Sequence, residues 1–378
     1  MLVLPLAACG SKSAPLPDAL PAVEYSRYGV SWEQATPDSK RVLVVVNMDS
    51  PISRKIAEYY CTKRRIPKEN TVVIRTEGDK EAVAELTYEQ RILAPVKAAV
   101  KAAKNPIDFI VTTKGVPIRI GDATGYSVDS CLLAMDRTVR PAPAAAPPKE
   151  RQEEFSKAIA QNINPYGGRA EPFSSKKFGI YLVCRLDGYD WADIKGLIDN
   201  SLAAKPMKGL FYFNTAANRT APGYVEKQLT LERAHTYMRR KGLDSILNKG
   251  PFAVPKQPVM GYGSWGSNDG TFNMEKYRQI RFVPGAIAET FVSTSGRTFN
   301  PTVGGQSLIA DLVHQGVTGV KGYVAEPYAF ALCEVDILMD RYTGGFNLAE
   351  SFYMSSIVVH WKDVVIGDPL CRPYKGGK

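Results

Sequence analysis

Short apolar runs alternate with amphipathic stretches along most of the chain, beginning near residue 41. Residues 41–47 (RVLVVVN) are almost continuously hydrophobic, which is the pattern of a strand buried on both faces. Residues 51–65 repeat apolar side chains with helical spacing, and residues 71–74 (TVVI) form another short apolar run. A helix over 88–104 and a strand over 108–113 continue the pattern. This alternation predicts a parallel sheet.

The alternation stops at residues 137–150, where four prolines among alanines predict a loop, and then returns. Strands are expected at 178–183, 210–213, 258–263, 286–293, 317–324 and 364–366, and helices at 191–204, 306–315 and 348–361. The helix at 306–315 is expected to stop at Gly316. We therefore predict an α/β fold with a parallel-rich sheet flanked by helices, arranged as α/β subdomains over 40–205 and 206–378.

The first nine residues, MLVLPLAAC, form a short apolar stretch that ends in a cysteine. The tetrad Leu6-Ala7-Ala8-Cys9 resembles the lipobox of bacterial lipoproteins, in which the cysteine is lipidated. We interpret 1–9 as a truncated signal and 10–39, rich in Ser, Pro and Ala, as a flexible tether. The resemblance implies a membrane anchor at Cys9 and a periplasmic or surface-facing position in the cell envelope. The alternative is an ordinary apolar N-terminus.

Charge and cysteine usage narrow the classes of function. The net charge of +10 is spread along the chain, and the basic clusters at 63–65 and 239–241 are each expected to end a helix. No nucleic-acid-binding motif is present, whereas a basic exterior favours anionic envelope polymers. The cysteines form no CxxC pair, so neither a zinc site nor an organic cofactor is indicated. Cys184, inside an apolar run, is expected in the core.

Several segments resemble an uncharacterised family of bacterial exported proteins. They are Asn47 with 50–53 (SPIS), 57–60 (AEYY), 65–67 (RIP), 113–117 (TKGVP), 185–188 (RLDG), 322–328 (GYVAEPY) and 366–374 (IGDPLCRPY). They span nearly everything after the tether, but the family brings no established activity.

The C-terminal half is similar, more distantly, to gingipain-type cysteine peptidases of the caspase fold. In those enzymes a His-Gly follows one parallel strand and a catalytic Cys follows the next. Here Tyr262 stands where the histidine is expected, and residues 293–295 (STS) stand where the cysteine is expected. A serine without an adjacent base is a poor nucleophile, and a phenol with an ordinary pKa of about 10 replaces an imidazole badly. The resemblance therefore implies a caspase-like pseudoenzyme without the dyad.

None of the three histidines is expected to restore the dyad. His314 is predicted to cap carbonyl groups in the last turn of its helix, and His360 is expected on a helix beside Trp361. His235 falls in a charged segment. All three are interpreted as structural.

Polar residues follow several predicted strands at their carboxyl ends, where open α/β sheets bind ligands. They are Asn47, Lys114, Asp187, Tyr262, Trp265, Ser293, Ser295 and Glu326. We expect them to line one cleft. The alternative is that several are turn formers or caps, with Asn47 capping a helix and Asp187-Gly188 forming a turn.

These residues allow three classes of function. A binding protein would stack a sugar or peptide on Trp265, Tyr262 and Tyr323. A hydrolase would use Ser295 or Glu326, with Glu326 partly buried, shifted in pKa and paired with Asp187 or Asp269. A peptidase-like component of a secretion or surface assembly rests on analogy alone. The sequence favours an envelope-tethered protein that binds a peptide or an envelope polysaccharide.

Two glycine-containing motifs add little to this choice. Residues 261–266 (GYGSWG) match the dinucleotide-binding spacing, but turn formers follow where that motif needs a helix. Residues 302–305 precede a predicted helix whose N-terminus could hold an anion, which is a common arrangement.

Overall fold

The computed structural model describes residues 38–78, 80–138, 152–207 and 209–375. The lipobox with Cys9, nearly all of the tether and most of the Pro/Ala loop lie outside these residues. Among the residues that are described, no helix is long and apolar enough to cross a membrane.

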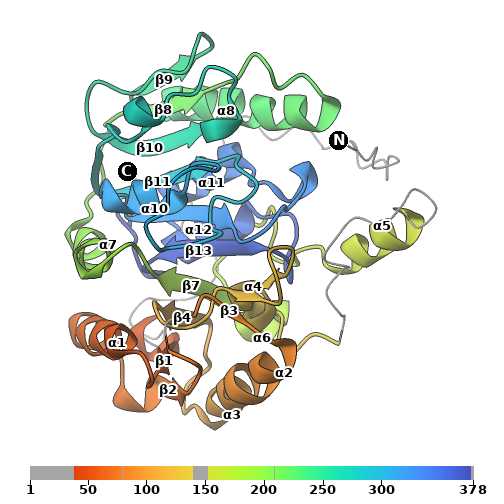
Figure 1. Ribbon diagram of the computed structural model, residues 1–378. Coiled ribbons are helices and arrows are strands. Elements are labelled where there is room, and N and C mark those ends of the chain that lie inside the picture. The colour runs from red at the N-terminus through yellow and green to blue at the C-terminus, as the bar shows by residue number, and fades with distance from the viewer. Residues whose placement is uncertain (1–37, 79, 139–151, 208, 376–378) are drawn as a thin grey trace.

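A sheet of ten strands forms the centre of the molecule, in the order β2-β1-β4-β7-β13-β12-β11-β10-β8-β9 (Figure 1). Every neighbouring pair is parallel except β12 and β13. The predicted α/β fold with a parallel-rich sheet is therefore confirmed. The strands are β1 (Val42–Asn47), β2 (Thr71–Ile74), β4 (Phe109–Thr113), β7 (Leu182–Leu186), β8 (Phe211–Asn214), β9 (Ser245–Asn248), β10 (Val259–Ser264), β11 (Phe282–Thr290), β12 (Gly319–Tyr323) and β13 (Asp363–Gly367).

The antiparallel β12/β13 pair divides the sheet into two parallel halves that run in opposite directions. The carboxyl ends of β1, β4 and β7 therefore emerge at one edge, and those of β8, β10, β11 and β12 emerge at the other. The hydrophobic core is nevertheless continuous across both halves, from Val42 to Tyr374. A small second sheet, β3 (Ala82–Val83), β5 (Arg119–Ile120) and β6 (Tyr126–Ser127), lies beside it.

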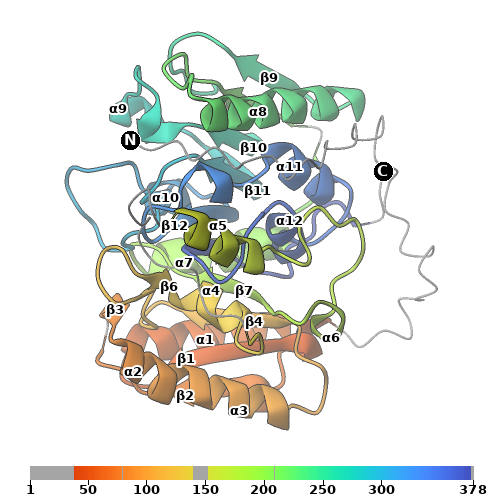
Figure 2. The ribbon, with the colours of Figure 1, turned by 90° about the vertical axis from the view of Figure 1, so that its right-hand side faces the viewer.

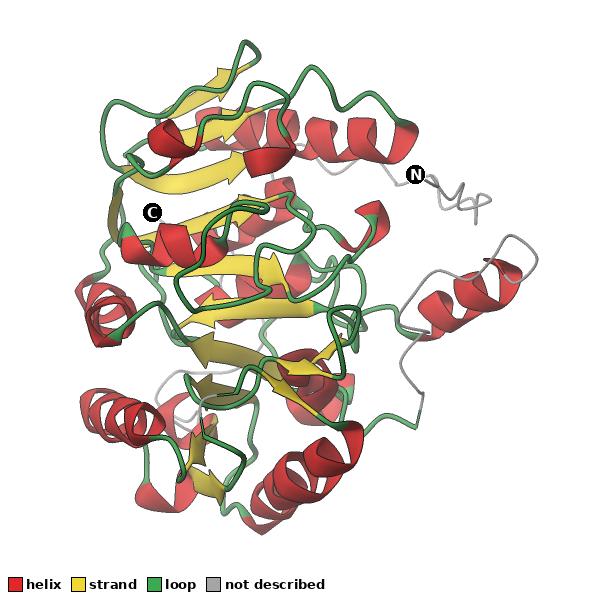
Figure 3. Cartoon of the chain, in the orientation of Figure 1, coloured by secondary structure: helices red, strands yellow, loops and turns green. Residues whose placement is uncertain are grey.

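Helices flank the ten strands on both sides (Figure 3). α7 contacts α1 and α10 in one layer, and α11 contacts α8 and α12 in the other. The two layers cover opposite faces of β12, since Gly322 faces α10 and Gly319 faces α12 (Figure 2). The helices are α1 (Pro51–Arg64), α2 (Glu85–Tyr88), α3 (Ala94–Ala102), α4 (Val128–Leu133), α5 (Gln152–Gln161), α6 (Ser175–Phe178), α7 (Trp191–Ala203), α8 (Pro222–Arg240), α9 (Met274–Tyr277), α10 (Ile309–His314), α11 (Val335–Thr343) and α12 (Leu348–Met354).

Local chemistry explains several helix ends. Ser50 caps α1, because its hydroxyl accepts a hydrogen bond from the Ser53 N–H. The two basic clusters end α1 and α8, as predicted, where cations suit the negative end of the helix dipole. Gly316, with φ +92°, follows α10 and ends it where the sequence places the stop.

Other elements differ from their predicted bounds. Residues 175–178 form the short helix α6, so β7 begins only at Leu182. The helix predicted to reach residue 361 ends at Met354, and His360 has a left-handed backbone with φ +59° rather than a helical one. The helix α11 and the edge strand β9 carry polar residues that obscure their pattern, and the sequence did not predict them; of α8 it predicted only the end.

Candidate functional site

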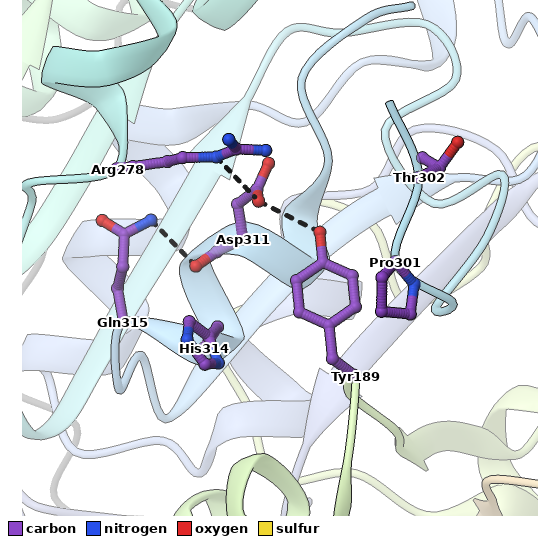
Figure 4. A pocket seen from close by; sticks show the side chains of 7 residues that line it. All are labelled: Tyr189, Arg278, Pro301, Thr302, Asp311, His314 and Gln315. Atoms are coloured by element: carbon purple, nitrogen blue, oxygen red, sulfur yellow. Dashed lines mark hydrogen bonds and ion pairs between the residues drawn. The ribbon is translucent and has the colours of Figure 1, made fainter. Parts of the chain in front are cut away.

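A pocket of about 320 Å³ lies where the loop after β7 meets α10, and Figure 4 shows the side chains around it. The loop between β11 and α10 supplies one wall, and Arg278, which precedes β11, supplies another. The pocket therefore lies beside the central strands of the sheet, at the end of the sheet where β7 finishes and β12 starts. Its lining residues are Tyr189, Arg278, Pro301, Thr302, Asp311, His314 and Gln315.

An aspartate holds the imidazole at the rim of this pocket. Nδ1 of His314 lies 2.9 Å from Oδ1 of Asp193. The other oxygen of this carboxylate accepts a hydrogen bond of 3.0 Å from the Tyr189 N–H, and the Asp193 N–H is itself capped by Asp190. Asp193 is buried, whereas the His314 side chain is 64% exposed. A carboxylate fixed by backbone contacts therefore orients an accessible imidazole ring.

This contact determines the expected tautomer of His314. A carboxylate accepts but does not donate, so Nδ1 carries the proton that it shares with Asp193. Among the described residues no hydrogen bond reaches Nε2. The neutral ring therefore presents a lone pair at Nε2, the nitrogen that a base uses to accept a proton.

A second carboxylate occupies the floor of the pocket. The Tyr189 hydroxyl donates a hydrogen bond of 3.0 Å to Oδ1 of Asp311, and Nε of Arg278 lies 3.4 Å from the same oxygen (Figure 4). Burial, with the Asp311 carboxylate next, raises the pKa of Tyr189, so the phenol keeps its proton. The Arg278 side chain, 56% exposed, offsets the charge of Asp311.

Lys114 connects two chain segments that lead into the walls of the pocket. Its Nζ donates to the carbonyl of Gly188 at 2.9 Å and to that of Phe299 at 3.0 Å, and it lies 3.2 Å from Oδ1 of Asp187. The N–H of Phe299 is in turn held by the carboxylate of Glu81. The chain segments just before Tyr189 and just before Pro301 are thus fixed by one ammonium group.

Gly188 allows the loop after β7 to pack closely against α7 and α10. A Cβ on this residue would lie 2.7 Å from the Cβ of Asp193 and 3.3 Å from Cγ1 of Val313. A larger residue would push the loop after β7 away from α10 and open the pocket. The predicted Asp187-Gly188 turn therefore has a packing role, with Asp187 accepting from the Gly188 N–H at 2.9 Å.

The structure brings together three of the residues predicted as a site, at the carboxyl edge of β1, β4 and β7. The Asn47 amide donates to the Gly115 carbonyl at 2.7 Å, next to Lys114 and Asp187. Lys114 and Asp187 support the segments that lead into the pocket, Asn47 lies further away, and none of the three is among the lining residues. Burial raises the pKa of Asp187, although Lys114 and Arg185 oppose that shift. Asn47 does not cap α1, since Ser50 does.

The remaining predicted residues lie at the opposite edge, because the second half of the sheet runs in the other direction. Trp265 and Ser295 are buried there, and Ser293 is half-buried. Tyr262 lies inside β10 and is 0% exposed, stacked against Tyr212. The eight predicted residues therefore do not form one cleft.

The aromatic rings proposed to stack on a ligand and the serine proposed as a nucleophile are all buried, so none of them can reach a ligand. The rings of Tyr262, Trp265 and Tyr323 are each at most 1% exposed, so none can lie against a ligand. The Ser295 hydroxyl is fully buried against β12 and has no hydrogen-bond partner within the described parts of the chain. No hydrogen bond therefore joins it to a base in the part of the chain that the structure describes.

Glu289 occupies the buried position that was expected for Glu326. Glu326 is exposed and accepts from the Tyr328 N–H, so the burial expected of it is absent. Glu289 lies on β11, 0% exposed, between Lys321 and Tyr323, and the Tyr323 hydroxyl donates to its Oε1 at 3.1 Å. Burial raises the pKa of Glu289 to about 8, against the opposing charge of Lys321.

The glycines of the 261–266 motif serve packing. A Cβ on Gly261 would lie 2.3 Å from the Phe211 ring, and one on Gly263 would lie 2.8 Å from Leu231 of α8. A short 3₁₀ turn follows at Gly266–Asn268, not an α-helix. Of residues 302–305, Thr302 does line the pocket, but α10 begins only at Ile309.

Sequence reasoning missed the main residues of the pocket. Tyr189, Arg278, Asp311 and His314 line the pocket, and Asp193 lies behind it; they come from three separate segments of the chain, and no spacing marks them as a set. The one available signal was a histidine near a helix end. His314 was assigned there to carbonyl capping, whereas its ring contacts Asp193.

Thiols and metals do not add a further centre. Cys184 lies in β7 and is fully buried, as predicted for a core residue. The cysteines that the structure describes are all free, and no metal-binding cluster of His, Cys, Asp and Glu is found within the described ranges.

No family model and no curated protein matches this chain. The pocket is therefore the feature from which a function can be inferred.

Proposed function

We propose that this protein binds a glycan in the pocket between the loop after β7 and α10. The observation that carries the proposal is the set of groups around one hollow. The half-buried Tyr189 ring, with its centroid 6.0 Å from that of His314, offers a face for a sugar ring. Asp311, Gln315, Arg278 and Thr302 offer acceptors and donors for hydroxyl groups. Ligand sites typically combine an apolar lining with a few such polar groups.

Charge favours a hydroxyl-rich, uncharged ligand. Arg278 is paired with Asp311, and the buried Asp193 lies directly behind the rim. A phosphate or carboxylate would therefore meet two aspartates and one already paired arginine. Sugar hydroxyls both donate and accept, so they match a pocket that contains both kinds of group.

A peptide ligand has less support. Extended peptides commonly bind by pairing with an open sheet edge, and here the edge strands are β2 and β9. The pocket lies beside β7 and α10 in the middle of the sheet, away from both edges. Its volume is at the low end of the range of about 300–1,000 Å³ typical of small-ligand sites.

We also propose that the domain is lipid-anchored in the bacterial cell envelope through Cys9. The lipobox-like tetrad 6–9 and the Ser/Pro/Ala-rich stretch after it support this location, and a basic chain suits an anionic envelope. Metabolic labelling with a palmitate analogue should mark the wild-type chain and not Cys9→Ser. Equal labelling of both chains would refute the anchor.

A hydrolase built on Ser295 and Glu326 is not favoured by any contact. The hydroxyl is sealed in the core and the carboxylate is exposed in a different loop. We propose the caspase-like scaffold from the sequence resemblance alone. Its framework would be the sheet whose two halves run in opposite directions.

Binding can be tested by probing the full chain on a microarray of bacterial oligosaccharides, with a tetrapeptide library in parallel. We expect oligosaccharides to bind, and Tyr189→Ala to weaken the best of them about fivefold, since a lost stacking contact costs about 1 kcal/mol. Lys249→Ala removes an exposed charge from an ion pair with Glu232 outside the pocket and serves as the control. Binding of peptides only, or equal binding by Tyr189→Ala, would overturn the proposal.

A further inference from the structure

The oriented imidazole of His314 gives the pocket a group that can act in catalysis, in addition to a surface for binding. His314 is the one pocket-lining side chain whose ordinary chemistry includes taking up a proton near neutral pH. Asp193 fixes its Nδ1 from behind, and Nε2 remains the nitrogen that can reach a bound molecule. This is the arrangement of a general base with its orienting carboxylate.

The Asp193–His314 contact also has a structural explanation, which the test must separate from catalysis. Asp193 lies in the first turn of α7 and His314 in the last turn of α10, where each charge suits the helix dipole. A purely structural contact would not need an exposed ring. The His314 side chain is 64% exposed and borders the hollow.

Other groups in the pocket suit the remaining needs of an acyl transfer to water. The Tyr189 hydroxyl donates its one proton to Asp311, so the donors to a substrate must come from Arg278. The Arg278 guanidinium carries five N–H groups, of which only the Nε one points to Asp311 at 3.4 Å. These donors can stabilise the negative charge that develops on a carbonyl oxygen.

We propose that the pocket hydrolyses acyl esters carried on sugar hydroxyls, with His314 as the general base and Asp193 as its positioning residue. This rests on the glycan site proposed above. The imidazole Nε2 takes a proton from water as the water oxygen bonds to the ester carbonyl carbon. The carbon–oxygen bond to the sugar then breaks, and the imidazolium returns the proton to the sugar oxygen. The products are a carboxylic acid and a free sugar hydroxyl.

An ester fits this set of groups better than a phosphate ester does. A neutral acyl ester meets no charge repulsion from Asp311 in the pocket or from Asp193 behind it, and it needs only one proton shuttled by the imidazole. A covalent intermediate is not required, because the attacking oxygen comes from water. Thr302 lines the pocket, but no contact between its hydroxyl and the imidazole is found within the described residues.

The test measures acetate release from peracetylated cellobiose by the full chain between pH 5 and 8. His314→Gln should lower the rate of release about 100-fold or more, whereas His235→Gln, which changes a histidine on α8 outside the pocket, should leave it unchanged. Release that is equal in His314→Gln and wild type would overturn the proposal.

A spectroscopic readout tests Asp193 independently of turnover. In a ¹⁵N spectrum of the imidazoles at pH 8, Nδ1 of His314 should carry the proton in the wild type, and Asp193→Asn should shift that tautomer. An Nε2-protonated ring in the wild type would contradict the assignment of the base.

The two proposals fail in different ways. Oligosaccharide binding without acetate release would overturn the ester hydrolysis and leave the glycan site standing. Absence of both binding and release would overturn both.

Discussion

Oδ1 of Asp193 and Nδ1 of His314 lie 2.9 Å apart, although 121 residues separate them in the chain. One residue belongs to the first turn of α7 and the other to the last turn of α10. The contact exists because the loop after β7 turns tightly at Gly188 and packs against α10. The contact joins Asp193 on α7, which follows β7 in the first half of the sheet, to His314 on α10, which precedes β12 in the second half.

Lys114 should influence ligand binding although it does not line the pocket. Lys114→Met removes the ammonium that holds the carbonyls of Gly188 and Phe299, so both walls should loosen. We expect faster amide hydrogen exchange in residues 299–302 and a several-fold loss of oligosaccharide affinity. Lys80→Met, which removes an exposed ion pair with Glu77, is the control. Unchanged exchange in Lys114→Met would refute this anchoring role.

Glu289 should make the stability of the protein depend on pH. Its pKa is about 8 in the folded state and ordinary, about 4.5, in the unfolded state, so the folded state binds more protons between these values. The contribution of this group to the free energy of unfolding should therefore be fully present below about pH 4.5. It should fall by up to about 1.4 kcal/mol per pH unit as the pH rises toward 8.

Urea denaturation of Glu289→Gln at pH 5, 6.5 and 8 measures this contribution, because glutamine cannot ionise. The variant should lose the pH-dependent fall that the wild type shows in this window. Glu326→Gln, an exposed carboxyl after β12, should keep it. An identical slope for Glu289→Gln and the wild type would show that Glu289 ionises normally.

A buried ion pair should contribute far more than an exposed one. Arg185 is 0% exposed, and its guanidinium contacts both oxygens of Asp129 at 2.9 and 2.7 Å. Asp129→Ala leaves that charge with fewer partners and should cost about 3–5 kcal/mol of unfolding free energy. Asp49→Ala breaks the exposed pair with Arg75 and should cost about 1 kcal/mol or less. Equal losses in chemical denaturation would contradict the burial of Arg185.

Two glycines should respond in opposite directions to alanine. Gly261→Ala places a Cβ 2.3 Å from the Phe211 ring and should destabilise the fold by about 1–3 kcal/mol. Gly196 lies inside α7 with open space around it, so Gly196→Ala should stabilise by about 0.5–1 kcal/mol. Thermal unfolding measures both. A neutral Gly261→Ala would show that this motif glycine is not required for packing.

Local patterns along the chain were enough to predict most of the sheet. The strands β1, β2, β4, β10, β12 and β13 lie where apolar runs predicted them, since a strand buried on both faces leaves a continuous apolar run. The basic clusters and Gly316 marked helix ends for equally local reasons. Helices such as α8, whose buried residues are separated by charged ones, left a weaker pattern.

The candidate site could not be predicted in the same way. Its position depends on the reversal of direction between β12 and β13, and that pairing is a long-range contact that no local pattern records. The residues at the ends of β1, β4 and β7 do lie at one end of the sheet, as predicted from their positions after parallel strands, but they do not line the pocket. Those at the ends of β10 and β11 were assigned to the same cleft because the whole sheet was treated as running in one direction.

The most direct test of the binding account follows the imidazole signals in a ¹H–¹³C spectrum while the best oligosaccharide from the microarray is added. His314 borders the proposed site, whereas the ring of His235 contacts Ser245 on the far side of β8 and β10. The account predicts that the His314 signals shift in proportion to binding while those of His235 stay in place. Saturable binding with an unmoved His314 would place the ligand elsewhere and contradict the account.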